Sequence, residues 1–121
     1  MPQPSIKLLE QDYFLILSTP HETTSGSDID PHVREHLAWL LALEAEGVVV
    51  MSGPLLEGPG AAPGAGVTVL RATDRHEAES IAASDPFVIA GLRRFDVFKW
   101  RVNEGSVSVT LSLGTGTFDW R

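Results

Sequence analysis

The chain has 121 residues, which is the size of one ordinary domain, so a separate cofactor-binding domain is not expected. Hydrophobic residues make up 43% and charged residues 21% of the sequence, proportions typical of a globular protein rather than a disordered one. Nine Lys and Arg residues against sixteen Asp and Glu residues give a formal net charge of -7. Because this charge repels phosphate backbones and anionic lipids, nucleic acid and membrane partners are not expected.

The sequence contains no cysteine, which excludes disulfides, thiolate zinc sites and a cysteine nucleophile. Residues 1–7 do not form a charged start followed by a long apolar run. Apolar stretches elsewhere fall far short of the ~20 residues that a membrane span needs. We therefore expect a soluble, cytoplasmic protein.

The first element is a strand. Residues 13–17 are a continuous apolar run rich in aromatic and β-branched side chains and bounded by polar residues, which predicts a central, buried strand. Residues 19–30 are polar, contain Pro20 and Gly26, and follow neither a helical nor a strand period. This segment is predicted to be a long loop and is a candidate lid.

A helix is predicted from Asp30 to Glu46. Asp30 is expected to be the N-cap, Pro31 suits the first helical position, and Gly47 is placed to end the helix. One face of this helix is apolar, at Val33, Leu37, Leu40 and Leu41, and is expected to be buried.

Two further strands are predicted after this helix. Residues 48–52 are apolar and predict a second buried strand, while residues 66–72 alternate well enough to predict a third. Residues 55–65, rich in glycine and proline, connect the two strands, which we expect to form a hairpin.

The second helix is predicted to begin at Asp74, because Glu77 three residues later makes a pattern close to a capping box. The helix should end near Ser84, since the residue before Pro86 is disfavoured in helical conformation. Residues 86–91 are expected to add about one further turn. The inward side chains of the second helix are expected to be Ala78, Ile81 and Ala82.

The last predicted elements are a fourth strand over residues 95–102, a turn at 103–105 and a fifth strand over 106–113, while residues 114–121 stay ambiguous. The order β-α-β-β-α-β predicts an α+β, ferredoxin-like fold, an antiparallel sheet with two helices on one face and an extra C-terminal strand. Since the first two strands are apolar throughout, a second copy is expected to cover the open face, which predicts a homodimer.

His36 is the most informative histidine. On a helical wheel it lies at the rim of the apolar face and points toward the sheet. A partly buried histidine bonded to a backbone carbonyl would occupy the same place. The functional alternative is a general acid or base, because imidazole is the commonest proton-transfer group near neutral pH.

Asp85 is the second candidate. An Asp before a proline that starts a helical turn is an ordinary N-cap. A carboxylate at the end of the second helix can also orient an imidazole on the first helix and stabilise its charge. Trp39 and Trp100 are candidates to line an apolar pocket, although core or dimer packing is the more frequent use of tryptophan.

His32 and His36 are four residues apart, a spacing that can place two imidazoles on one metal ion. Zinc would need a third ligand, for which Asp28, Asp30 and His21 are the nearby candidates. Without the Glu of the metalloprotease pattern this signal is weak. No metal and no cofactor are therefore expected.

Three stretches resemble the YCII-related (YciI-like) family of the dimeric α/β-barrel superfamily. They are residues 34–40, residues 46–55, and residues 77–92 with the sequence Ser84-Asp85-Pro86-Phe87. The likeness covers about residues 12–102 and implies one YCII-related domain over 1–121, with 103–121 as a C-terminal extension. It also implies a ferredoxin-like subunit that dimerises through its sheet, similar in architecture to muconolactone isomerase.

The resemblance also implies an active site. The His and Asp positions of that family correspond to His36 and Asp85, and Ser52, Gly53 and Pro54 match the stretch that lines the same cleft, where they would bind substrate. One relative is a dehydrochlorinase acting on a chlorinated hydroxyhydroquinone. The implied activity is a cofactor-independent elimination or isomerisation of a small, oxygenated, ring-derived molecule.

Two functional hypotheses follow. In the first, the protein is a lyase or isomerase in which His36 exchanges a proton and Asp85 holds its tautomer. In the second, the same cleft binds a small-molecule ligand without turnover, in a regulatory dimer.

Overall fold

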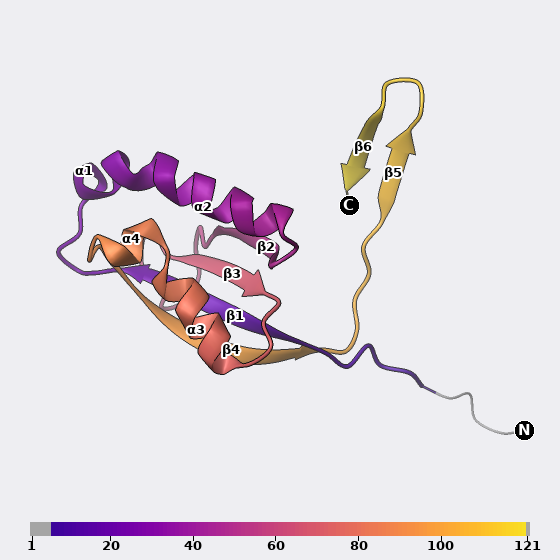
Figure 1. The fold of residues 1–121 in the computed structure, drawn as a ribbon, viewed down its shortest axis with the longest axis horizontal. Helices are drawn as coiled ribbons and strands as arrows, with labels where there is room; N and C mark the ends of the chain where they lie inside the picture. The colour runs from indigo at the N-terminus through magenta and orange to yellow at the C-terminus, as the bar shows by residue number, and fades with distance from the viewer. Residues whose placement is uncertain (1–5, 121) are drawn as a thin grey trace, which may run out of the picture. The chain divides into compact units, whose positions relative to one another are not determined.

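The computed structural model describes residues 6–120 (Figure 1). Residues 12–100 form one compact unit, and the described residues on either side of them form a second. The expectation drawn from residues 1–7 falls mainly on residues 1–5, which lie outside the described residues. Within residues 6–120, no helix is long and apolar enough to cross a membrane.

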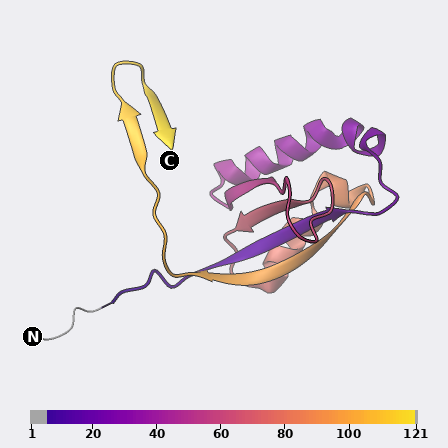
Figure 2. The same ribbon diagram turned by 180° about the vertical axis from the view of Figure 1, so that it is seen from behind.

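The larger unit is built on a four-stranded sheet with the order β2-β3-β1-β4. Helices α2 (Val33–Ala45) and α3 (Arg75–Ala83) lie over one face of this sheet (Figure 1), and Figure 2 shows the strands from the other side. This arrangement confirms the predicted ferredoxin-like α+β fold. The strands are β1 (Gln11–Pro20), β2 (Val49–Pro54), β3 (Gly66–Leu70) and β4 (Arg93–Val102).

The core lies between the sheet and α3. In the antiparallel pairing of β1 with β3, Phe14 lies opposite Leu70 and Ile16 opposite Thr68. Ile16 and Leu70 pack in one buried cluster with Ala82, as expected for an inward residue of the second helix. The small side chains of α3 let the helix lie close to the sheet, and Ala78 is fully buried there.

The ends of the helices follow the predicted caps. The Asp74 side chain accepts a hydrogen bond from the Glu77 backbone N–H at 2.8 Å, so α3 begins as expected. A further turn, α4 (Pro86–Ile89), follows α3 after Ser84. Gly47 has a φ of 76°, the left-handed conformation that ends α2 and that glycine adopts without strain.

Two details of residues 19–32 differ from the prediction. The segment is not a plain loop, because it contains helix α1 (Gly26–Ile29) and the 3-10 helix η1 (Asp30–His32). Ser25 and Asp28 form a capping box, with Asp in the place usually held by Glu or Gln. The N-cap of α2 is His32 rather than Asp30, because η1 continues directly into α2.

The predicted burial of two elements is wrong. Strand β2 was expected to be buried, but it is the edge of the sheet and is exposed from Met51 onward. Helix α2 contains no buried residue, and Leu37 and Leu41 are 51% and 60% exposed. An apolar pattern predicts the face of a helix but not whether that face meets a filled core. Leu37 and Leu40 of this face line a cavity instead.

In the smaller unit, β5 (Val109–Ser112) and β6 (Thr117–Trp120) form an antiparallel hairpin. The strand predicted over 106–113 therefore begins later than expected, and it pairs with β6, which the sequence pattern left ambiguous. Val109 lies opposite Trp120 and Leu111 opposite Phe118. These four apolar side chains alternate along their strands and share one face of the hairpin.

Candidate active site

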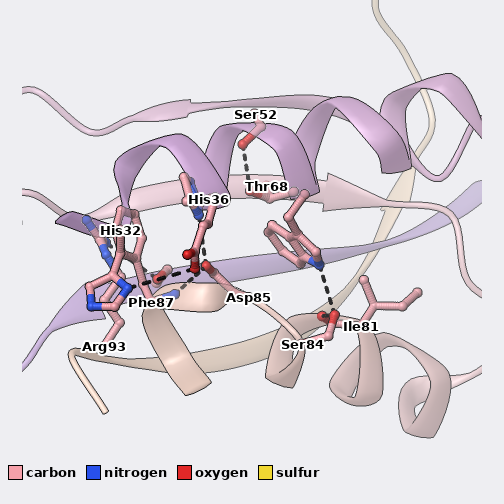
Figure 3. Close-up of polar contacts among 12 residues, drawn as sticks. His32, His36, Ser52, Thr68, Ile81, Ser84, Asp85, Phe87 and Arg93 are labelled. Atoms are coloured by element: carbon pink, nitrogen blue, oxygen red, sulfur yellow. Dashed lines mark hydrogen bonds and ion pairs between the residues drawn. The ribbon is translucent and has the colours of Figure 1, made fainter. Parts of the chain in front are cut away.

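His36 and Asp85 lie together between α2 and the start of α4. The Nδ1 atom of His36 is 2.8 Å from Oδ1 of Asp85 (Figure 3). The side chain of His36 is 22% exposed and that of Asp85 is 8% exposed. The alternative of a histidine bonded to a backbone carbonyl does not describe this contact, because the partner is a carboxylate.

Asp85 is also the N-cap of α4. The same oxygen, Oδ1, accepts the backbone N–H of Phe87 at 2.9 Å. Two donors on one oxygen hold the carboxylate in a single orientation. The cap and the imidazole contact are therefore two roles of one side chain.

The imidazole is held by its neighbours as well as by Asp85. The rings of His36 and Phe87 are stacked, with centroids 4.3 Å apart and planes at 24°. Trp39 lies 5.8 Å from the His36 ring, and its Nε1–H donates to Ser84 Oγ at 2.9 Å. This hydrogen bond ties α2 to the segment that carries Asp85.

The contact with Asp85 determines the tautomer of a neutral His36. An ionised carboxylate only accepts hydrogen bonds, so the proton of the neutral imidazole is on Nδ1. The lone pair is then on Nε2. The arrangement leaves Nε2 free to take a proton from a molecule beside the ring.

A cavity of about 340 Å³ lies beside this pair, between α2 and the sheet. Its volume suits a ligand of one aromatic ring with substituents. Ser52, Gly53 and Pro54 line it together with His36 and Asp85, so the structure places all five predicted site residues around one space. Apolar side chains make up most of the wall, among them Ile16, Leu37, Trp39, Leu40, Leu70, Val88 and Phe95.

The remaining polar wall comes mainly from the strands. Ser52 Oγ and Thr68 Oγ1 are 2.7 Å apart across β2 and β3 (Figure 3). Ser18 of β1 and Arg93 of β4 also line the cavity. Ser18, Thr68 and Arg93 were not among the residues predicted from the sequence.

Arg93 begins β4 and lies on the same face of the sheet as Phe95 and Val97, at alternate positions. Its Nη1 is 3.5 Å from Ser18 Oγ, and its guanidinium lies over the Phe87 ring at 5.0 Å. Burial lowers the pKa of Arg93 below its ordinary value, and the charge of Asp85 acts in the opposite direction. Arg93 occupies the same alternating positions as the apolar residues of this strand, and this pattern could have identified it in the sequence. It was missed because the strand was predicted to begin at Phe95.

Most of the other candidate residues lie outside this cavity. No group of three or more His, Asp or Glu side chains is placed to hold a metal ion within residues 6–120. His32 instead lies 4.0 Å from Glu35, one of its helix neighbours. Trp39 lines the cavity, but Trp100 does not, and neither does any part of the candidate lid over 19–30.

The fold and the cavity define a ferredoxin-like α+β protein with a His–Asp pair at a ring-sized pocket. The chain belongs to the YCII-related domain family, which matches residues 13–101. No curated protein matches the chain in sequence.

A solved structure is similar in both fold and sequence. It is 5-chloro-2-hydroxyhydroquinone dehydrochlorinase from Burkholderia phenoliruptrix AC1100, in complex with 2,5-dihydroxybenzoquinone. The TM-score is 0.60 and the sequence identity 26%, and the similarity covers 73% of this chain and 92% of the other. The similar enzyme was thus solved with a small ring-shaped ligand.

Proposed function

We propose that the protein is a cofactor-independent lyase or isomerase that acts on a small, oxygenated, ring-derived molecule. Nε2 of His36 exchanges the proton with the substrate, while Asp85 holds the tautomer and stabilises the imidazolium. The observation that carries the proposal is the 2.8 Å contact between His36 Nδ1 and Asp85 Oδ1 at the wall of the cavity. Proton transfer of this kind contributes roughly 10²- to 10⁴-fold to a rate.

The similarity to a dehydrochlorinase supports a lyase-like reaction. In such an elimination the base takes a proton from the substrate, the electron pair forms the new π-bond, and chloride leaves, so that HCl is lost overall. The chain supplies a base in His36 and an apolar wall that excludes water. Ser52, Gly53 and Pro54 line the same cavity and are proposed to contact the substrate.

We also propose that the working unit is a homodimer formed through the sheet face opposite the helices. Phe98 and Trp100 of β4 alternate on that face and are 52% and 44% exposed, and Met51 of β2 is 47% exposed. Covering this apolar face with a second copy would remove it from water. The single YCII-related domain with residues 103–121 as an extension, and the cytoplasmic location, stay predictions.

The first test uses 5-chloro-2-hydroxyhydroquinone, the substrate named for the similar enzyme. Chloride release from this compound is measured under anaerobic conditions. Turnover by the wild type that falls at least about 100-fold in His36→Asn, with the far-UV spectrum unchanged, supports the proposal. Saturable binding of 2,5-dihydroxybenzoquinone without turnover of the chlorinated compound would instead favour the ligand-binding dimer.

A further inference from the structure

Arg93 is a cation with unfilled hydrogen-bonding capacity at the cavity wall. A guanidinium carries five N–H donors and stays charged in proteins. Within residues 6–120 no carboxylate oxygen lies within the 4.0 Å of an ion pair with Arg93, and its Nε is buried without a hydrogen-bond partner. The contact to Ser18 Oγ, at 3.5 Å, is at the outer limit of a hydrogen bond.

A role as the counter-charge of Asp85 does not account for this arrangement. Oδ1 of Asp85 already accepts from His36 and from the Phe87 backbone. The charge of Asp85 favours a charged Arg93 from a distance, but it fills none of the guanidinium donors. Nε is buried without a partner, which is unfavourable, and the only hydrogen bond of the Nη atoms within residues 6–120 is the long one to Ser18, so the guanidinium has donors available to a bound molecule.

The surroundings of Arg93 suit a planar ligand. Its guanidinium and the His36 imidazole both contact the Phe87 ring, at 5.0 Å and 4.3 Å, so one aromatic ring positions both the cation and the proposed base. Gly64 lies beside the guanidinium, since a Cβ built there would be in ordinary van der Waals contact with Nη2 of Arg93, at 4.0 Å. Arg93, His36 and Gly64 all line the one cavity.

We propose that Arg93, assisted by Ser18, is the anion-binding residue of this site and selects ring-derived ligands that carry an oxyanion. The oxyanion is an ionised enolic or phenolic oxygen, or a carboxylate. The two oxygens of a carboxylate match the paired N–H groups of a guanidinium. This inference rests on the proposed function only in placing the substrate in the same cavity. The cation holds the oxyanion while His36 exchanges a proton elsewhere on the ring.

The test is calorimetric binding of matched probes to the full chain. The enolic hydroxyls of 2,5-dihydroxybenzoquinone are acidic enough to be ionised at neutral pH, benzoate supplies the carboxylate, and hydroquinone is an uncharged ring. The wild type is expected to bind at least one anionic probe at least ten times more tightly than hydroquinone. Which anion binds more tightly distinguishes an enolate from a carboxylate site.

Arg93→Gln is expected to weaken binding of the preferred anion by roughly ten- to a hundredfold while changing hydroquinone affinity less than about threefold. Arg93→Lys should keep part of the preference, since it keeps the charge and loses the two-point geometry. Arg34→Gln is the control, because Arg34 is an exposed arginine of α2 that does not line the cavity. Its binding should equal that of the wild type.

Two results would overturn the inference. One is a wild type that binds hydroquinone as tightly as either anion. This measurement does not depend on the folding of any variant. The other is a folded Arg93→Gln protein that keeps the full anion preference. Failure of the proposed function would give a different result from failure of this inference. Anion binding would still depend on Arg93, but His36→Asn would leave any turnover unchanged.

Discussion

His36 and Asp85 are 49 residues apart in the sequence, and their side chains meet at 2.8 Å through Nδ1 and Oδ1. The same Asp85 oxygen caps α4 through the Phe87 backbone N–H, and the Phe87 ring stacks on the imidazole. The proposed base is therefore positioned by the beginning of a helix rather than by a flexible loop. Such support is what a proton-transfer group needs to keep its orientation.

Asp85→Ser separates the two roles of this residue. A serine hydroxyl can still cap α4 but is too short to reach His36, so the fold should lose only the stability of the imidazole contact while activity falls by at least about 100-fold. Asp85→Ala loses the cap as well and should cost a further ~0.5–2 kcal/mol of unfolding free energy. Urea unfolding and the chloride-release assay measure the two effects.

Equal activity in Asp85→Ser and the wild type would contradict the role given to the carboxylate. It would leave Asp85 as a helix cap alone.

The Trp39–Ser84 hydrogen bond should contribute to the position of the site. Trp39→Phe removes the Nε1–H donor and keeps an aromatic ring, and Ser84→Ala removes the acceptor. Each change should lower the unfolding free energy by ~0.5–1.5 kcal/mol. Because the two groups share one bond, the double variant should lose less than the sum of the single variants.

A double-mutant cycle by denaturant unfolding checks this coupling. Strict additivity would show that the hydrogen bond does not stabilise the fold in solution.

Much of the fold follows from local sequence signals. Asp74, Gly47 and Pro86 each act on their own neighbours, and the helix ends that they predict are present. The burial of β2 was not predictable in this way, since apolar residues 48–52 fit an edge strand as well as a central one. Strand order depends on the crossover connections, which no local pattern contains.

Five of the residues that line the cavity were predicted from the sequence, but their geometry was not. The sequence allowed two interpretations of Asp85, as a helix cap and as the partner of an imidazole. In the structure its Oδ1 atom makes both contacts. No spacing rule expresses a contact between a helix and a cap so far away in sequence. Arg93 was missed because its place in the alternation of β4 becomes visible only once the start of the strand is known.

The capping box at the start of α1 predicts a pH dependence. The Ser25 backbone N–H and hydroxyl both donate to Asp28 Oδ2, and the backbone bond is the main cause that lowers the pKa of Asp28 below its usual value. A carboxylate with a depressed folded-state pKa stabilises its helix above the ordinary Asp pKa. That contribution is lost as pH falls through the lower, folded-state pKa.

Carbon-detected NMR titration of the Asp28 carboxyl measures this pKa. Ser25→Ala should raise it part of the way toward the ordinary value, because the backbone bond stays. Ser27→Ala, the control, removes a hydroxyl that contacts Ser25 Oγ rather than the carboxylate. An Asp28 that titrates like an unstructured aspartate would contradict the capping box.

The proposed dimer predicts a strong effect of charge on the open face of the sheet. Phe98→Asp should convert a homodimer into a monomer, since burying an unpaired carboxylate in an apolar interface is costly. Leu56→Asp is the control, because Leu56 is 89% exposed and lies in the loop between β2 and β3. Light scattering coupled to gel filtration distinguishes the two states, and a monomeric wild type at micromolar concentration would exclude the dimer.

The most direct test of the central claim is the protonation pattern of His36 itself. In protein labelled with ¹⁵N-histidine at mildly alkaline pH, His36, assigned by comparison with His36→Gln, should carry its proton on Nδ1 and leave Nε2 unprotonated. Addition of 2,5-dihydroxybenzoquinone should then shift the Nε2 resonance most. A proton on Nε2, or an Nε2 resonance that saturating ligand leaves unchanged, would contradict the assignment of His36 as the base at this cavity.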